Sequence, residues 1–164
     1  MNINHLISDS IARIKNGYMK SYISVSIIKS KFIMTYGDGL ADIDINNLLD
    51  FNKRKDQIGT VSTTRPVSRF GLLETDENDN VVNFIEKPIL DSYINMGYMV
   101  FNKNVFDFID GDEPFEKEPL KRLTSEKELN AYKHEGFFRP MDTCREYLEL
   151  NELWKENNAP WKVK

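Results

Sequence analysis

The chain has little cysteine: Cys144 is the only one among its 164 residues, so no internal disulfide can form. Such scarcity is typical of a reducing compartment. No apolar run approaches the roughly 20 residues that a helix needs to cross a bilayer. The N-terminal residues also lack the basic and apolar segments of a secretory signal. We therefore expect a cytoplasmic protein that does not associate with a membrane.

Basic stripes and clusters of soft metal ligands are also missing. The 22 Lys and Arg residues are scattered among 26 Asp and Glu residues, which gives a net charge of −4 and argues against a nucleic-acid partner. His5 and His134 are far apart, and we expect both at the surface. Cys144 is expected to pack rather than to act as a nucleophile. An acidic chain that handles phosphates would need a metal ion, because two like charges about 4 Å apart repel by roughly 4 kcal/mol.

No repeat, low-complexity tract or linker interrupts the chain, so we expect a single domain over residues 1–164. Residues 1–30 have the least regular pattern. Within them, residues 23–27 alternate as a strand does, and residues 11–14 could form one helical turn. The patterns become clear only from Lys31 onward.

The periodicity predicts a mixed α/β sheet with antiparallel additions. Strands are expected at residues 31–36, 58–64, 70–75, 81–86, 93–102, 129–134 and 137–141, and helices at 45–55, 104–109, 119–126 and 143–156. The strand at 31–36 is continuously apolar, as in a parallel sheet, and forms a βαβ unit with the two elements that follow. Residues 76–80 are the polar turn of a hairpin. Asp44 is the expected N-cap of the first helix, and Tyr147, Leu150 and Trp154 form the expected buried face of the last.

One acidic turn follows the first clear strand, where Tyr36 leads into Gly37-Asp38-Gly39. Asp38 is then at the carboxyl edge of a strand, where open α/β sheets bind their ligands. Gly37 would let a ligand approach the backbone, because it has no side chain. The alternative is a simple turn aspartate with no ligand.

A second acidic turn precedes the last helix, where Met141 leads into Asp142-Thr143. Asp142 is either the N-cap of that helix, with Thr143 as the alternative cap, or a second ligand-binding carboxylate. Asp38 and Asp142 together could share one hard divalent cation such as Mg²⁺, which takes few carboxylates and adds substrate phosphates. The pair therefore points to phosphate chemistry.

Two further regions have residues that a purely structural role explains less well. Glu86 and Lys87 place two opposite charges at the end of a strand. They are either a surface ion pair, or Glu86 accepts hydrogen bonds from hydroxyl groups while the ammonium group of Lys87 binds a phosphate. Asn95 and Gly97 interrupt an apolar strand, which either a ligand contact or a β-bulge would explain. Gly71 suits the close approach of a sugar.

Several stretches occur together in one order along the chain: TYGDGLADID at 35–44, RFG at 69–71, EKP at 86–88, INMGY at 94–98, FEKEPL at 115–120, GFF at 136–138, MDT at 141–143 and APWK at 159–162. This set resembles the sugar-1-phosphate nucleotidyltransferase family, and within it the enzymes that form CDP-glucose. The resemblance covers residues 31–164. It implies a Rossmann-like, GT-A-like mixed sheet with antiparallel hairpin additions, truncated at its N-terminus.

The resemblance also implies roles for individual residues. Asp38 and Asp142 would hold Mg²⁺, and Gly37 would lie against the nucleotide. Lys87 would bind the phosphate of glucose 1-phosphate. Glu86, Asn95 and Gly71 would face the sugar hydroxyls. The implied reaction transfers a cytidylyl group from CTP to glucose 1-phosphate and releases pyrophosphate.

The N-terminal part departs from the family pattern. The glycine-rich loop that cradles the triphosphate, G-x-G-x-R-L, occurs nowhere in the sequence, and Tyr18 stands where the family has an arginine. The chain therefore looks like the C-terminal part of the enzyme. A non-catalytic sugar-phosphate-binding or subunit-interaction protein and an enzyme with another base or sugar remain as alternatives. The missing strands would leave a sheet edge open, so a homo-oligomer is a further expectation.

Overall fold

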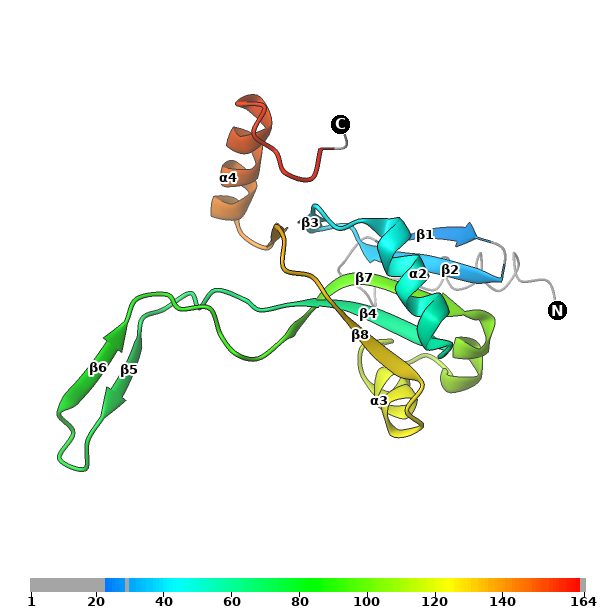
Figure 1. Ribbon diagram of the computed structural model, residues 1–164, viewed down its shortest axis with the longest axis horizontal. Helices are drawn as coiled ribbons and strands as arrows, with labels where there is room; N and C mark the ends of the chain where they lie inside the picture. The colour runs from blue at the N-terminus through cyan, green and yellow to red at the C-terminus, as the bar shows by residue number, and fades with distance from the viewer. Residues whose placement is uncertain (1–22, 29, 163–164) are drawn as a thin grey trace.

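The computed structural model of the chain describes residues 23–28 and 30–162. Its centre is a five-stranded sheet with the order β1-β2-β7-β4-β8 (Figure 1). These strands are β1 (Ile23–Ile28), β2 (Lys31–Tyr36), β7 (Ile94–Asn102), β4 (Gly59–Thr64) and β8 (Leu129–Lys133). All neighbours are antiparallel except β4 and β8, which are parallel. The predicted mixed α/β fold is confirmed, and the expected helical turn at residues 11–14 lies outside the described residues.

The predicted βαβ unit differs in one respect from the structure. β2 precedes α2 (Ile45–Lys55) in the chain and β4 follows it, and the two strands run in the same direction. In the sheet, however, β7 lies between them and is antiparallel to both. The expectation that β2 lies in a parallel pairing is therefore wrong. A continuous apolar run indicates that a strand is buried on both faces. It does not predict whether the neighbouring strands in the sheet are parallel or antiparallel to it.

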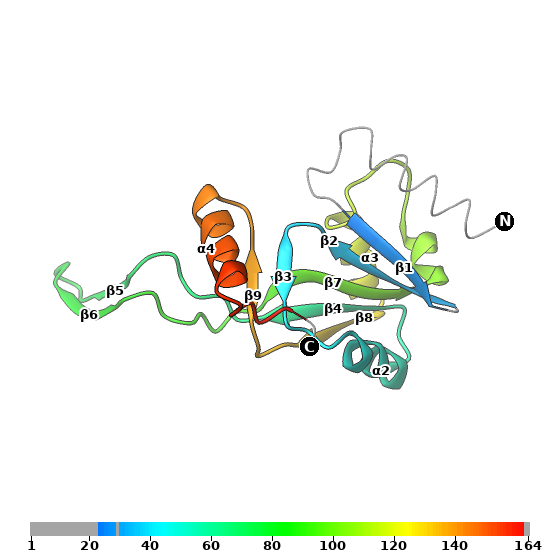
Figure 2. The ribbon, with the colours of Figure 1, turned by 90° about the horizontal axis from the view of Figure 1, so that it is seen from above.

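Two core clusters pack on opposite faces of the sheet and explain the apolar run of β2. Ile33 packs with Val100 of β7 and Leu48 of α2. Met34 points to the other face, where it packs with Met99 and Phe101 of β7. That second cluster is closed by Val105 of η2 (Lys103–Phe108) and Leu123 of α3 (Glu118–Ser125). Figure 2 shows α2 and α3 on opposite sides of the strands.

The remaining elements lie at one end of this sheet (Figure 2). β3 (Gly39–Ala41) and β9 (Phe138–Pro140) form a short antiparallel ladder, and α4 (Cys144–Lys155) follows β9. β5 (Leu72–Thr75) and β6 (Val81–Ile85) form the predicted hairpin. Residues 66–90, here called the arm, project away from the main sheet (Figure 1).

The arm carries a set of exposed apolar side chains. Its base is closed by backbone hydrogen bonds from Ser68 N to Pro88 O, at 2.8 Å, and from Leu90 N to Pro66 O, at 2.9 Å. The carboxylate of Asp76 accepts hydrogen bonds from Asn78 N and Asn80 N and fixes the turn. The exposed apolar residues are Val67, Phe70, Leu72, Leu73, Val81, Val82, Phe84, Ile85 and Ile89.

Three side-chain expectations can be compared with the structure here. Asp44 is the N-cap of α2, as predicted, because its Oδ1 accepts hydrogen bonds from Asn46 N and Asn47 N. Leu150 is buried, but Tyr147 and Trp154 are 52% and 55% exposed, since α4 packs along a single narrow stripe. Cys144 is exposed in the first turn of α4, so its predicted packing is also wrong.

His134 was expected at the surface, but its side chain is only 11% exposed. Its Nε2 lies 2.9 Å from Asp42 Oδ1, which connects β8 to the segment after β3. A single histidine in a polar sequence gives no sign of such a distant partner. Among the residues that the structure describes, no helix is both long and apolar enough to span a membrane.

Asn52 is a buried polar residue that joins three elements. It is 0% exposed, its Nδ2 donates to Thr60 Oγ1 of β4 at 2.9 Å, and its Oδ1 accepts from Lys31 Nζ of β2 at 2.6 Å. Every buried polar group of this kind needs a partner, because an unpaired one costs about 1–3 kcal/mol. Asn52 therefore aligns α2 with the sheet.

We predict that Asn52→Ala lowers the free energy of unfolding by about 2–3 kcal/mol, because Thr60 loses its buried partner. Urea unfolding followed by circular dichroism measures this change. Asn46→Ala is the matched control on the exposed side of α2, and its effect should stay within about 0.5 kcal/mol. Equal losses in the two variants would contradict the role given to Asn52.

Candidate active site

The first acidic turn connects β2 to β3 and places Asp38 just after the carboxyl end of β2, which lies between β1 and β7 in the sheet. Asp38 O accepts a hydrogen bond from Met141 N at 2.7 Å. This bond extends the β3–β9 ladder, in which Gly39 faces Pro140. Asp38 and Asp142, which are distant in sequence, therefore lie at the same end of the short ladder.

The second acidic turn shows which of two residues caps α4. Thr143 is the N-cap, because its Oγ1 accepts from Glu146 N at 3.2 Å and Glu146 Oε2 accepts from Thr143 N at 2.9 Å. Asp142 N donates to the same Oε2 at 3.0 Å. The Asp142 carboxylate takes no part in the cap and is 55% exposed, so it is left to bind elsewhere.

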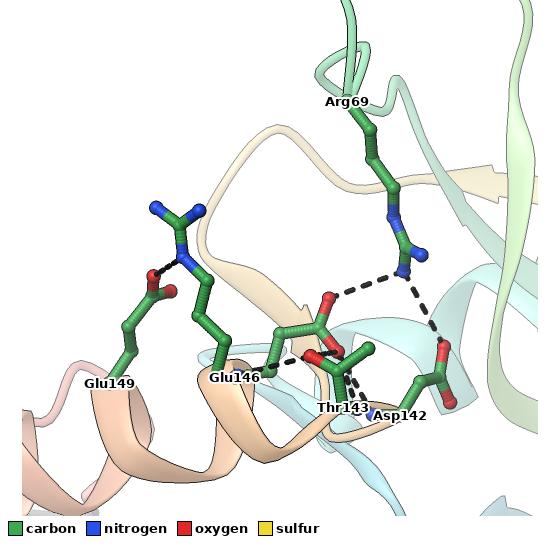
Figure 3. A network of polar contacts seen from close by, with 6 residues as sticks. Arg69, Asp142, Thr143, Glu146 and Glu149 are labelled. Carbon is green, nitrogen blue, oxygen red and sulfur yellow. Dashed lines mark hydrogen bonds and ion pairs between the residues drawn. The ribbon is translucent and has the colours of Figure 1, made fainter.

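Arg69 of the arm reaches this capping network (Figure 3). Its Nη2 lies 3.2 Å from Glu146 Oε1 and 3.9 Å from Asp142 Oδ2. Burial opposes ionisation of Glu146, but hydrogen bonds from Thr143 and Asp142 and the charge of Arg69 outweigh it and hold the pKa of Glu146 below its ordinary value. Glu146 is therefore an anion at neutral pH.

Sequence reasoning did not find this network. Thr143 and Glu146 have the spacing of a capping box, which is a signal that the sequence contains. Arg69 contacts Glu146 across 77 positions, and no local pattern predicts that pair.

The donors at this end of the ladder fit a hard cation with few protein ligands. Asp38 and Asp142 offer carboxylate oxygens, and the part of the chain that the structure describes has no group of three or more His, Cys, Asp or Glu residues suited to a metal. Mg²⁺ is commonly held by one or two carboxylates, with phosphate oxygens and water completing its shell. The donor set is therefore compatible with the predicted ion.

Asn95 and Gly97 belong to a bulge at the start of β7, which was one of the two interpretations of this stretch. The register with β4 shifts here, since Val61 faces Met99 while Thr63 faces Asn95. Asn95 Oδ1 accepts from Gly97 N at 2.8 Å. Whether Asn95 also contacts a sugar remains a prediction.

Two tyrosines hold the acidic turn against this bulge. Tyr98 OH donates to Gly39 O at 2.8 Å, immediately after Asp38. Gly97 has φ +83°, and a Cβ there would lie 2.4 Å from Tyr36 Cδ2, so the Tyr36 ring packs on it. Tyr36 OH donates to Glu116 Oε1 at 2.8 Å. Burial, together with the negative charge of Glu116, raises the pKa of Tyr36.

The remaining predicted residues gather on the arm. A Cβ on Gly71 would lie 3.1 Å from Glu86 Oε2, so these two residues are neighbours. Lys87 has φ +46°, and its Nζ lies 3.5 Å from Glu86 Oε1, with both side chains exposed. This is the predicted ion pair at the end of the hairpin. Within residues 30–162, no hydrogen bond or ion pair joins Glu86 or Lys87 to Asp38 or Asp142.

We predict that Tyr36→Phe reduces the loss of stability at alkaline pH. In the unfolded chain Tyr36 loses its proton near its ordinary pKa of 10.0, whereas in the folded protein it keeps it to higher pH. The contribution of Tyr36 to the free energy of unfolding is therefore fully present below about pH 10 and falls as the pH rises above that value. Thermal unfolding between pH 8 and about pH 11 measures the slope. Tyr147→Phe, at a 52% exposed residue, is the control and should keep the wild-type slope. An unchanged slope in Tyr36→Phe would contradict the prediction.

Comparisons with known proteins show the family of the chain. The profile of the nucleotidyl transferase family matches residues 11–155. A glucose-1-phosphate cytidylyltransferase from Salmonella typhi is 44% identical over 134 residues, which are 80% of this chain and 52% of that protein. A probable glucose-1-phosphate cytidylyltransferase from Bacillus subtilis is 41% identical over the same shares. A putative mannose-1-phosphate guanyltransferase from Sulfolobus acidocaldarius is 31% identical over 82% of this chain and 38% of its own length.

Solved structures show the same fold at lower identity. HddC from Yersinia pseudotuberculosis has a TM-score of 0.55 and 19% identity, and the match covers 93% of this chain and 75% of that one. A putative glucose-1-phosphate thymidylyltransferase from Bacillus anthracis has a TM-score of 0.54 and 16% identity, with 90% and 71% covered. The chain spans about half the length of the curated relatives named first. The family match over most of its residues shows that this chain belongs to the nucleotidyl transferase family.

Proposed function

We propose that the chain contains the metal and sugar-phosphate part of a site that transfers a cytidylyl group from CTP to glucose 1-phosphate, giving CDP-glucose and pyrophosphate. The observation that carries this proposal is the meeting of Asp38 and Asp142 at one end of the β3–β9 ladder. The choice of CTP and glucose 1-phosphate is supported by relatives at 44% and 41% identity that are described as glucose-1-phosphate cytidylyltransferases.

Asp38 and Asp142 are the residues that would hold Mg²⁺. The bound ion would neutralise phosphate charge, which an acidic chain cannot do with carboxylates alone. Gly37, which is exposed and has no side chain, leaves room beside Asp38 for the nucleotide. The Tyr98 hydrogen bond to Gly39 O and the Met141 hydrogen bond to Asp38 O keep this turn in place.

The arm would bind the sugar phosphate. Lys87 is exposed and in the left-handed region of the Ramachandran map, a conformation that recurs at functional sites. Its ammonium group would pair with the phosphate of glucose 1-phosphate. Glu86 and Gly71 lie together, so a sugar could approach the backbone while its hydroxyls donate to the carboxylate. Asn95, at the bulge, would face the same sugar.

In the proposed reaction a phosphate oxygen of glucose 1-phosphate attacks the α-phosphorus of CTP. The bond between that phosphorus and the bridging oxygen breaks, and pyrophosphate leaves. No side chain needs to form a covalent bond with the substrate. The residues named above align the reactants and offset charge, which are the main contributions of proteins to transfer at phosphorus.

A second candidate is a protein that binds sugar phosphate without turnover. It is favoured by the position of Glu86 and Lys87 on the arm, because no hydrogen bond or ion pair within residues 30–162 joins them to Asp38 or Asp142. Another base or sugar is the third candidate, which the 31% identical guanyltransferase relative makes relevant. Ligand titrations distinguish all three.

We predict that calorimetry detects glucose 1-phosphate binding that Lys87→Ala weakens by at least about tenfold, because a paired charge on phosphate is lost. Lys53→Ala, at an exposed residue of α2, is the matched control. CTP, GTP and mannose 1-phosphate are titrated in parallel, each with and without Mg²⁺. Binding of glucose 1-phosphate without CTP would support the non-catalytic candidate, and preference for GTP or mannose 1-phosphate would support the third. Binding of none of them would overturn the proposal.

A pyrophosphate-release assay tests the metal carboxylates. If the chain turns over CTP and glucose 1-phosphate, Asp38→Asn should lower kcat by at least about a hundredfold, since charge stabilisation of the transition state is lost. Asp50→Asn makes the same change on the exposed side of α2 and should leave kcat unaltered. Unchanged turnover in Asp38→Asn would exclude the role given to that residue.

A further inference from the structure

Arg69 is the arm residue whose side chain crosses to the start of α4 (Figure 3). Its Nη2 is shared between two carboxylates, at 3.2 Å from Glu146 Oε1 and 3.9 Å from Asp142 Oδ2. The shorter contact is to Glu146. The longer contact is to the aspartate that the proposed function gives to a divalent cation.

The two carboxylates differ in how firmly they are held. Glu146 is 13% exposed, and its Oε2 accepts from Asp142 N, Thr143 N and Thr143 Oγ1, which leaves Oε1 directed at Arg69. The Asp142 side chain is 55% exposed and makes no such set of hydrogen bonds among the described residues. Glu146 can therefore keep Arg69 paired while Asp142 exchanges one partner for another.

A guanidinium group and a metal ion make opposite demands on one carboxylate. Both are attracted to Asp142, and they repel each other. Two like charges about 4 Å apart repel by roughly 1 kcal/mol in bulk water and by roughly 4 kcal/mol near a protein surface. An arginine this close to a metal-binding carboxylate lowers its affinity for cations unless the arginine moves away.

We propose that Arg69 is the resident counter-ion of Asp142 and competes with a divalent cation for that carboxylate. When a cation binds, the guanidinium group then pairs with Glu146 alone. The hydrogen bonds of the cap keep the Glu146 carboxylate in position for this pairing. This inference rests on the proposed function, since it takes Asp142 as a metal ligand. It gives Arg69 a role in setting cation affinity, distinct from any contact with substrate.

The test is the affinity of the protein for Mn²⁺ alone, measured by calorimetry and by loss of the free-ion electron paramagnetic resonance signal. Arg69→Gln should bind Mn²⁺ about three- to tenfold more tightly than the wild type, and Arg69→Lys should stay close to it. Arg145→Gln is the matched control, because it also removes one arginine charge. Arg145 is on α4, and its Nε lies 2.9 Å from Glu149 Oε1. This substitution should change the affinity less than about twofold. The gain in Arg69→Gln should shrink at high salt.

The outcomes separate this inference from the proposed function. Asp142→Asn should abolish the tight Mn²⁺ site; if it binds as the wild type does, the proposed metal role of Asp142 fails and the inference fails with it. Loss of the site in Asp142→Asn with unchanged or weaker binding in Arg69→Gln overturns the inference alone. If the wild type binds no Mn²⁺, a site gained in Arg69→Gln supports the inference, and no gain overturns it.

Discussion

Burial of β7 on both faces is the constraint from which the rest of the fold follows. Met99, Val100 and Phe101 are fully buried at its centre, and they alternate between the two core clusters. α2 packs over one face of the sheet, and η2 and α3 pack over the other. The bulged start of β7 places Tyr98 against Gly39 O and Gly97 against the Tyr36 ring, so the core also positions the acidic turn.

Backbone hydrogen bonds, rather than side chains, bring the two candidate metal ligands together. β3 and β9 are only three residues each, and the bond from Met141 N to Asp38 O extends their ladder. The capping box of Thr143 and Glu146 then begins α4 directly after Asp142 and leaves its carboxylate out of the cap. The ladder bond uses the backbone oxygen of Asp38, and the cap uses the backbone nitrogen of Asp142, so neither contact occupies a carboxylate group.

The arm has a different physical character from the sheet. Its cross-strand pairs, Leu72 with Ile85 and Leu73 with Phe84, are apolar but exposed. A two-stranded hairpin is only marginally stable by itself in water. The Asp76 turn, the hydrogen bonds at its base and the ion pair of Arg69 with Glu146 support it. Gly71, Glu86 and Lys87, which are proposed to bind the sugar phosphate, therefore lie on a part of the molecule that is less tightly held than the β3–β9 ladder.

The sequence by itself determined the family and most of the elements, although no pattern predicted the three-residue strand β3. The alternation of apolar residues, the Asp44 cap, the polar turn at 76–80 and the ordered short stretches are local signals, because each depends on residues close together in the chain. Only the tertiary structure decided that β7 lies between β2 and β4, that Tyr147 and Trp154 stay exposed, and that His134 contacts Asp42. It also decided that Arg69 reaches Asp142 and Glu146. These features join residues far apart in the chain, and the packing of the whole domain, rather than any local preference, selects them.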